Sequence, residues 1–434
     1  MLTLIGLGVI AIVVALLLSG RVSPVVALAL VPLAGAVVSG FSPVEIGDFF
    51  GAGLQKVAPV AAMFIFAILF FGVMQDAGLF RPIIDGLIKL TGGNVIAVAV
   101  GTSVAGMLAH LDGAGATTFL LTIPALTPVY KRLRMSLYLM LMLLAIGAGI
   151  FNMMPWAGPL GRAAAVIGVD VAELWQPLIP VQLAGALLLV AFAGLLGVRE
   201  QRRIANLPIA ETAPPGPMAE APRDEYRDRT PRLQVAVNAA IFAAVMASLV
   251  AGMLPAAYVF MIGLGVALLV NARGAKAQMD AIAAHAPTAL SMAAIIFAAG
   301  AFLGVMDKSG MLSSIAGDVA NVLPSAFVPY LHLALGVFGL PMELILNTDA
   351  YYFGVLPVVT EIVGPHGVAP ETAVYALMVG NVVGTFISPF SPALWLALGL
   401  AGLEMGTHIR YALAPMWLFS LALMAIAGAM GLLT

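Results

Sequence analysis

The sequence predicts an all-α membrane protein with many spans, organised as two inverted repeats. The first observation is composition: the 434 residues are 62% hydrophobic and only 9% charged, against about 25% charged in soluble proteins. The second is that several apolar segments are interrupted by glycine, proline and polar residues at what would be membrane depth. The third is that motifs of the first half return in the second. We expect each half to contain five spans and one re-entrant hairpin, with broken helices.

Composition also removes several classes of function. The chain has no cysteine, which excludes disulfides and thiolate metal sites. With a net charge of −2 and no basic stripe, it gives no reason to expect a nucleic-acid partner. No HExxH motif and no paired catalytic carboxylates are present. We therefore predict that the protein is not an enzyme and needs no cofactor of its own.

A polar, proline-rich stretch divides the chain into two apolar halves. We assign residues 1–197 to the first repeat, 198–232 to a solvent-exposed linker, and 233–434 to the second repeat. The apolar segments of the first half are 2–19, 23–40, 57–75, 95–129, 136–167 and 177–197. Those of the second half are 233–253, 256–271, 286–306, 326–363, 372–400 and 411–432.

Landmarks of the two halves recur in the same order at a nearly constant spacing. The matching pairs are Gly72–Leu79 with Gly304–Met311, Pro155 with Pro389, and Asp170 with Glu404. Because five crossings are an odd number, the second half would enter the bilayer in the opposite orientation. Inverted repeats with paired broken helices are typical of secondary transporters, whose site lies near the membrane midplane.

The basic residues give an independent test of this topology. All but three of the 19 lysines and arginines fall on one predicted side of the membrane, the exceptions being Lys56, Lys308 and Arg162. The positive-inside rule then places the linker and the first hairpin in the cytoplasm. Both termini and the second hairpin are expected on the outer side.

The first predicted hairpin carries polar residues at its tip, Leu111–Thr118. Asp112 could bind a cation or a proton, while Thr117 and Thr118 could donate hydrogen bonds to a substrate. Ionisable residues at membrane depth are functional candidates by default. The alternative is a glycine-rich turn in which Asp112 caps a helix.

The first broken helix is predicted at Asn152–Pro159, where two prolines remove backbone donors and free carbonyl groups. Asn152 is a candidate substrate ligand. Arg162 follows as the single Lys or Arg inside a predicted span, and its forked guanidinium suits a carboxylate. The alternative for Arg162 is a side chain that reaches the surface or pairs with a nearby acid.

Corresponding polar groups lie in the second half. Asn347, Thr348 and Asp349 mark the tip of the second hairpin, with Asp349 as the counterpart of Asp112. Ser388 and Ser391 mark the second broken helix. We expect Asn347, Thr348, Ser388 and Ser391 to contact substrate, although serine and threonine also commonly bond to their own helix backbone.

At these motifs the chain resembles the citrate–metal:proton symporter (CitMHS) family of the ion-transporter superfamily. The resemblance runs from end to end apart from the linker, and its specific motifs are Leu111–Thr118, Asn152–Arg162 and Asp349–Pro357. It implies proton-driven uptake of citrate complexed to a divalent cation such as Mg²⁺ or Ca²⁺. It also implies a homodimer and a fold similar to the dicarboxylate/sodium symporters, with an elevator motion.

We therefore predict a secondary transporter of the bacterial inner membrane that imports citrate, or a related di- or tricarboxylate, with proton coupling. Asp112 and Asp349 would bind the proton or coupling cation, and Arg162 with the hairpin-tip amides would bind carboxylate. A resident metal site cannot be assigned from the sequence. The main alternative is a cation/proton antiporter on the same fold, which would leave Arg162 unexplained. A channel with paired hairpins is a further alternative.

Overall fold

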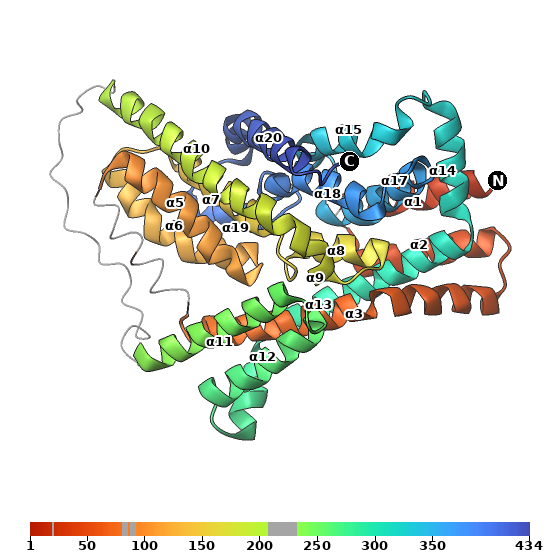
Figure 1. Cartoon of the computed structure of the whole chain (residues 1–434), viewed down its shortest axis with the longest axis horizontal. Coiled ribbons are helices and arrows are strands. Elements are labelled where there is room, and N and C mark those ends of the chain that lie inside the picture. The colour runs from red at the N-terminus through yellow and green to blue at the C-terminus, as the bar shows by residue number, and fades with distance from the viewer. Residues whose placement is uncertain (20, 80–85, 87–92, 207–231) are drawn as a thin grey trace.

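The computed structural model describes the chain except for residues 20, 80–85, 87–92 and 207–231 (Figure 1). Within the described residues every regular element is a helix. The helices of the first half are α1 (Leu2–Ser19), α2 (Pro24–Val38), α3 (Pro43–Asp76), α5 (Val95–Ala109), α6 (Gly115–Arg132), α7 (Leu137–Phe151), α8 (Gly158–Ile167), α9 (Val171–Trp175) and α10 (Ile179–Ala205). Most of the predicted linker lies outside the described residues.

The described part of the second half also consists of long, short and interrupted helices. Its helices are α11 (Arg232–Ala251), α12 (Ala256–Asn271), α13 (Gly274–Lys308), α14 (Met311–Val322), α15 (Leu331–Val337), α16 (Gly339–Met342), α17 (Leu356–Val363), α18 (Pro370–Asn381), α19 (Pro392–Ala401) and α20 (Met405–Ala429). A π-helical turn, η5 (Ala350–Val355), precedes α17, and a 3₁₀ turn, η7 (Val382–Phe386), follows α18. The inverted relation of the two halves stays a prediction.

The protein is a multi-pass membrane protein. In the described part of the chain, six helical stretches are long and apolar enough to cross a bilayer, and six shorter apolar helices accompany them. The apolar segment 57–75 forms the second part of α3, which already begins at Pro43. Ser42 caps α3 by accepting a hydrogen bond from the Glu45 amide, while the Glu45 carboxylate accepts one from the Ser42 amide.

Two groups of helices are visible in Figure 1. The long helices α3 and α13 cross along the lower part of the view together with α11 and α12, whereas α5, α7, α10, α18 and α20 pack above them. The close crossing of α3 and α13 depends on missing side chains. A Cβ atom on Gly53 would overlap the Gly300 carbonyl group, and one on Gly304 would overlap the Phe49 carbonyl oxygen.

The helices break where the sequence predicts breaks. α5 ends at the 3₁₀ turn His110–Asp112, and Gly113 then adopts φ 73°, a left-handed conformation that reverses the chain into α6. α7 stops at Phe151, and α8 resumes at Gly158 beside Pro159. In the second half of the chain, α18 is followed by η7 and then by α19, which begins at Pro392. These interruptions leave polar side chains and backbone groups inside the helix bundle.

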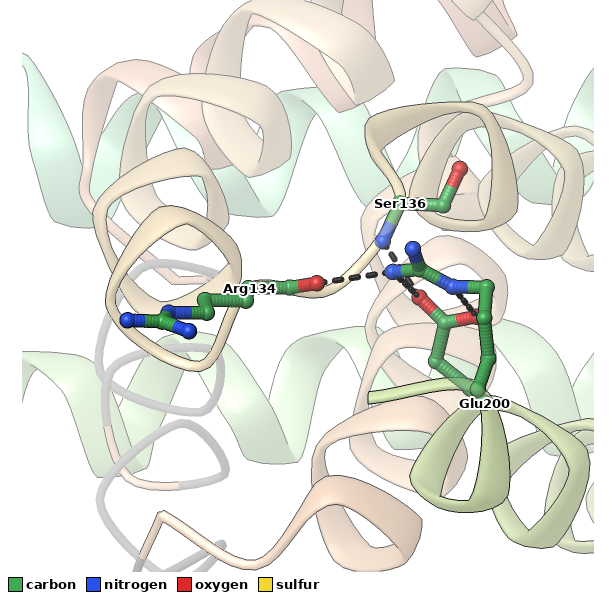
Figure 2. A network of polar contacts seen from close by, with 4 residues as sticks. Arg134, Ser136 and Glu200 are labelled. Carbon is green, nitrogen blue, oxygen red and sulfur yellow. Dashed lines mark hydrogen bonds and ion pairs between the residues drawn. The ribbon is translucent and has the colours of Figure 1, made fainter. Parts of the chain in front are cut away.

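A polar cluster ties the end of α10 to the loop between α6 and α7 (Figure 2). The Glu200 carboxylate, only 5% exposed, accepts hydrogen bonds from the Ser136 amide at 2.5 Å and from the Arg203 guanidinium at 2.7 and 2.8 Å. Arg203 also donates to the Arg134 carbonyl oxygen at 2.7 Å. Arg134 has φ 55°, so these donors and acceptors hold an otherwise strained turn.

Candidate functional site

A polar cavity of about 560 Å³ lies between the loop that joins α1 to α2 and the interrupted elements of the second half. This volume falls in the range of small-molecule sites, roughly 300–1,000 Å³. The lining residues are Leu17, Arg21, Val22, Ser23, Pro24, Arg162, Asn347, Thr348, Asp349, Ser388, Phe390, Ser391 and Pro392. Segments from both halves of the chain therefore form the cavity.

The charged centre of the cavity is an ion pair between the two halves. Arg162 Nε donates to Asp349 Oδ1 at 2.6 Å, and the two side chains are only 10% and 13% exposed. Arg162 lies one turn into α8, and Asp349 directly precedes η5. Asp349 contacts only Nε of the guanidinium. The terminal Nη groups of Arg162 make no hydrogen bond to another described residue. Those donors can bind an incoming carboxylate.

The tip of the second hairpin is fixed by its own side chains. Asn347 Oδ1 accepts a hydrogen bond from the Ala350 amide at 2.8 Å, and Asn347 Nδ2 donates to the Leu17 carbonyl oxygen at 3.2 Å. Thr348 lies between Asn347 and Asp349 on the cavity wall. The first contact stabilises the turn into η5, and the second joins the hairpin to the end of α1.

The second broken helix closes another wall of the cavity. Ser388 Oγ donates to the Glu343 carbonyl oxygen at 2.6 Å and accepts from the Phe390 amide at 3.3 Å. Ser391 precedes the first turn of α19, and its hydroxyl makes no capping hydrogen bond there. Ser388 therefore has a structural contact as well as a place at the cavity, whereas the Ser391 hydroxyl remains available to a ligand.

The polar residues of the first hairpin form a separate network. His110 is fully buried, with Nδ1 2.8 Å from Thr118 Oγ1 and Nε2 2.9 Å from Asn152 Oδ1. Thr118 Oγ1 also lies 2.9 Å from the Ala114 carbonyl oxygen. Trp156 adds a further link, because its Nε1 donates to the Leu111 carbonyl oxygen at 2.8 Å. The network joins the hairpin tip to the first broken helix.

Asp112 closes the turn of this hairpin. Its Oδ1 accepts a hydrogen bond from the Ala114 amide at 2.9 Å, and its Oδ2 accepts one from Thr117 Oγ1. Thr117 is also 2.9 Å from the Ala114 carbonyl oxygen. Asp112 is partly exposed, so both a turn-forming role and ion binding are compatible with its position.

The ten predicted site residues therefore do not surround one cavity. The structure brings together Arg162, Asn347, Thr348, Asp349, Ser388 and Ser391. The other four, Asp112, Thr117, Thr118 and Asn152, do not line this cavity. Hydrogen bonds hold Thr118 and Asn152 at His110, and hold Asp112 and Thr117 at the turn around Ala114, so packing places all four in this separate network.

Arg21 is a cavity residue that the sequence prediction did not include. It lies in a short loop, and in the sequence it counts as one of many basic residues on the predicted cytoplasmic side and as part of Arg21–Pro24, a weak motif of the family resemblance. The sequence does place Arg21 just before a helix, because Ser23 and Pro24 are typical of a helix start. Among the described residues, no group of three or more His, Asp or Glu side chains is arranged to hold a metal ion.

Comparison with solved structures identifies the fold. The chain is similar to the YdaH transporter of Alcanivorax borkumensis (TM-score 0.59, 18% identity, covering 88% of this chain and 86% of that one). It is also similar to MtrF of Neisseria gonorrhoeae (TM-score 0.65, 15% identity, covering 88% and 84%). These similarities confirm the predicted class of an all-α membrane protein with many spans, whereas the inverted repeats stay a prediction.

Sequence comparison identifies the family. A Bacillus subtilis citrate transporter is 35% identical over 411 residues, covering 95% of this chain and 94% of that protein. A Mg²⁺/citrate complex secondary transporter of the same organism is 34% identical, covering 98% of each chain. The CitMHS family model, described as citrate transporter, matches residues 1–380. The chain belongs to the CitMHS family of citrate transporters, and it is a transporter rather than an enzyme.

Proposed function

We propose that this protein imports citrate, complexed to a divalent cation such as Mg²⁺ or Ca²⁺, and that the polar cavity is the substrate site. The observation that carries the proposal is Arg162 at the cavity wall, with terminal guanidinium nitrogens free of hydrogen bonds to other described residues. A forked guanidinium binds a carboxylate through two parallel hydrogen bonds. The hydroxyls of Thr348 and Ser391 supply neutral donors for the remaining carboxylate and hydroxyl groups.

The charges around the cavity suit a metal complex. Arg21 and Arg162 contribute two positive charges and Asp349 one negative charge, so the lining is a net monocation. A fully ionised tricarboxylate bound to a divalent cation is a monoanion, which matches this charge. The free trianion would bring two more negative charges close to Asp349, and like charges brought together in this way are unfavourable. The cavity would thus be neutral with the complex bound but would carry a net charge of −2 with free citrate, and an uncompensated charge in a partly buried site is costly.

Asp349 offers a direct route to proton coupling. While ionised, it occupies Nε of Arg162 and competes with an anionic substrate for the guanidinium. A proton on Asp349 removes that competition and makes the lining more positive. Proton and substrate then bind with positive cooperativity, and linkage makes the effect reciprocal. Asp112, at the tip of the other hairpin, is the second site proposed for the proton or coupling cation.

The transport cycle proposed here is an elevator motion in a homodimer of the bacterial inner membrane. The cavity lies between the α1–α2 loop and the interrupted helices of the second half. In an elevator motion, the interrupted helices would move together with the bound substrate relative to the rest of the protein. The linker and the first hairpin would face the cytoplasm, with both termini outside. Related di- and tricarboxylates are the competing substrates.

Calorimetry on purified protein tests the proposal. We expect Mg²⁺–citrate to bind, and citrate in the presence of a chelator to bind more weakly, with succinate and malate as controls. Tight binding of metal-free citrate would contradict the charge argument. Failure of every carboxylate to bind would reject the proposed function and favour the cation/proton antiporter. Proton-driven uptake of labelled citrate into proteoliposomes then tests the coupling.

A further inference from the structure

Glu343 is a buried carboxyl group beside the cavity to which no role has yet been given. It follows α16 in the first arm of the second hairpin and is 1% exposed. Its Oε1 accepts a hydrogen bond from Asn381 Nδ2 at 2.9 Å. Its Oε2 is buried and has no hydrogen-bond partner among the described residues. One oxygen is therefore held in place, and the other is buried without a hydrogen bond.

This environment decides the protonation state of the carboxyl group. A buried carboxylate with an unpaired oxygen loses its hydration and gains only one hydrogen bond in return, which is far more costly than burying the neutral acid. Asn381 is neutral and offers no compensating charge. In the conformation described here, the favourable form of Glu343 is the protonated acid.

The charged and titratable groups around Glu343 lie on α8, at the tip of the second hairpin and on η5. Arg162 of α8 and Asp349 of the hairpin tip act on the carboxyl group through their charges. Tyr351 and Tyr352 of η5 are the neighbouring titratable side chains. Arg162 is already paired with Asp349 at 2.6 Å, so its charge is largely matched. Any event that changes this pairing, such as the arrival of a substrate carboxylate, changes the field at Glu343.

Direct contacts also connect Glu343 with the cavity wall. Ser388, which lines the cavity, donates to the Glu343 carbonyl oxygen at 2.6 Å. The backbone of η7 packs against the side chain, since a Cβ atom on Gly384 would lie 3.3 Å from Glu343 Cγ. Movement of the second broken helix relative to the second hairpin would therefore open the space around the carboxyl group to water.

We infer that Glu343 is a proton-binding site of the transport cycle, protonated in the conformation described here and deprotonated when the second broken helix moves away from the second hairpin. The carboxylic acid releases its proton to water entering from the cavity and becomes a carboxylate, and the reverse step takes a proton from that water. The inference rests on the proposed function for its coupling role, and it adds Glu343 to the sites at which a proton is carried.

Transport by reconstituted protein tests the coupling. Glu343→Gln keeps the shape and the neutral charge of the protonated acid but cannot release a proton. We expect this variant to bind Mg²⁺–citrate and to exchange internal for external labelled citrate. It should lose accumulation driven by a pH gradient. Glu361→Gln is the matched control, because Glu361 lies on α17 in the same hairpin and is exposed. Wild-type accumulation by Glu343→Gln would overturn the inference.

Infrared difference spectroscopy separates this inference from the proposed function. Spectra of wild type, Glu343→Asp and Glu361→Gln are compared across a pH series without substrate. We expect a buried protonated-carboxyl band in wild type that shifts in Glu343→Asp and is unchanged in Glu361→Gln. Absence of a band that responds to Glu343→Asp would overturn the proton site, even if Glu343→Gln fails to fold. A responding band in a protein that binds no citrate would reject the substrate and keep the proton site.

Discussion

At the scale of single residues, the chemistry depends on which polar atoms already have partners. Arg162 uses Nε for Asp349 and keeps its terminal nitrogens for a ligand. Thr118 and Asn152 belong to the same sequence motifs as other candidates, yet the buried imidazole of His110 joins them to each other. Residues of similar chemistry are therefore expected to respond differently to substitution.

Arg162 gives the first prediction. Arg162→Lys keeps the charge but loses the planar fork, so we expect the affinity for Mg²⁺–citrate to fall at least about tenfold, or ~1.4 kcal/mol. Arg162→Gln should abolish binding, because Asp349 is then left without its counter-ion. Calorimetry measures both effects. Wild-type affinity in Arg162→Lys would mean that substrate binds elsewhere.

Thr118 gives the opposite prediction. Thr118→Val removes the hydroxyl that contacts His110 and the Ala114 carbonyl group, leaving buried polar atoms unpaired at a cost of about 1–3 kcal/mol. The apparent melting temperature should fall while the affinity for Mg²⁺–citrate stays near wild type. Ser391→Ala is the complementary control, with normal stability and weakened binding. Lost binding by folded Thr118→Val would place the first hairpin at the substrate site.

At the scale of elements, glycine sets how closely helices cross. α3 and α13 are 34 and 35 residues long and meet at Gly53, Gly300 and Gly304. Long apolar helices in a bilayer gain little from the hydrophobic effect when they associate, so van der Waals contact at close approach supplies much of the attraction. The crossing is therefore sensitive to a single added methyl group.

Gly53 tests this crossing. Gly53→Ala places a Cβ atom against the Gly300 carbonyl group and must push the two helices apart. We expect a loss of about 1–3 kcal/mol, observed as a lower apparent melting temperature. Gly47→Ala on the same helix is the control, since a Cβ there meets nothing within 4 Å. Equal stability of the two variants would show that the crossing adjusts without cost.

At the scale of the whole molecule, the proposed elevator motion requires some helices to move past others. α1 contacts η5 of the second hairpin, and a Cβ on Gly354 would lie 3.2 Å from Val14 Cγ2. These two positions therefore report on movement between α1 and the second hairpin. Because the chain has no cysteine, an introduced pair would be the sole site of disulfide formation.

A disulfide at this contact tests the elevator prediction. In Val14→Cys/Gly354→Cys we expect oxidation to stop citrate uptake in proteoliposomes and a reductant to restore it. Each single cysteine variant is the control and should transport under both conditions. Calorimetry on the oxidised protein should still detect substrate. Undiminished transport by fully cross-linked protein would contradict a movement between these elements.

The sequence by itself determined the membrane class, the places where helices break, and six of the thirteen residues on the cavity wall. These features follow from local causes: apolar composition sets the spans, and glycine and proline interrupt the helix ladder. Only the tertiary structure decided that Arg162 pairs with Asp349, 187 residues away, and that Arg21 reaches the same cavity. It also decided that Thr118 and Asn152 form hydrogen bonds with His110, because buried polar atoms bond to the partners that packing brings within reach.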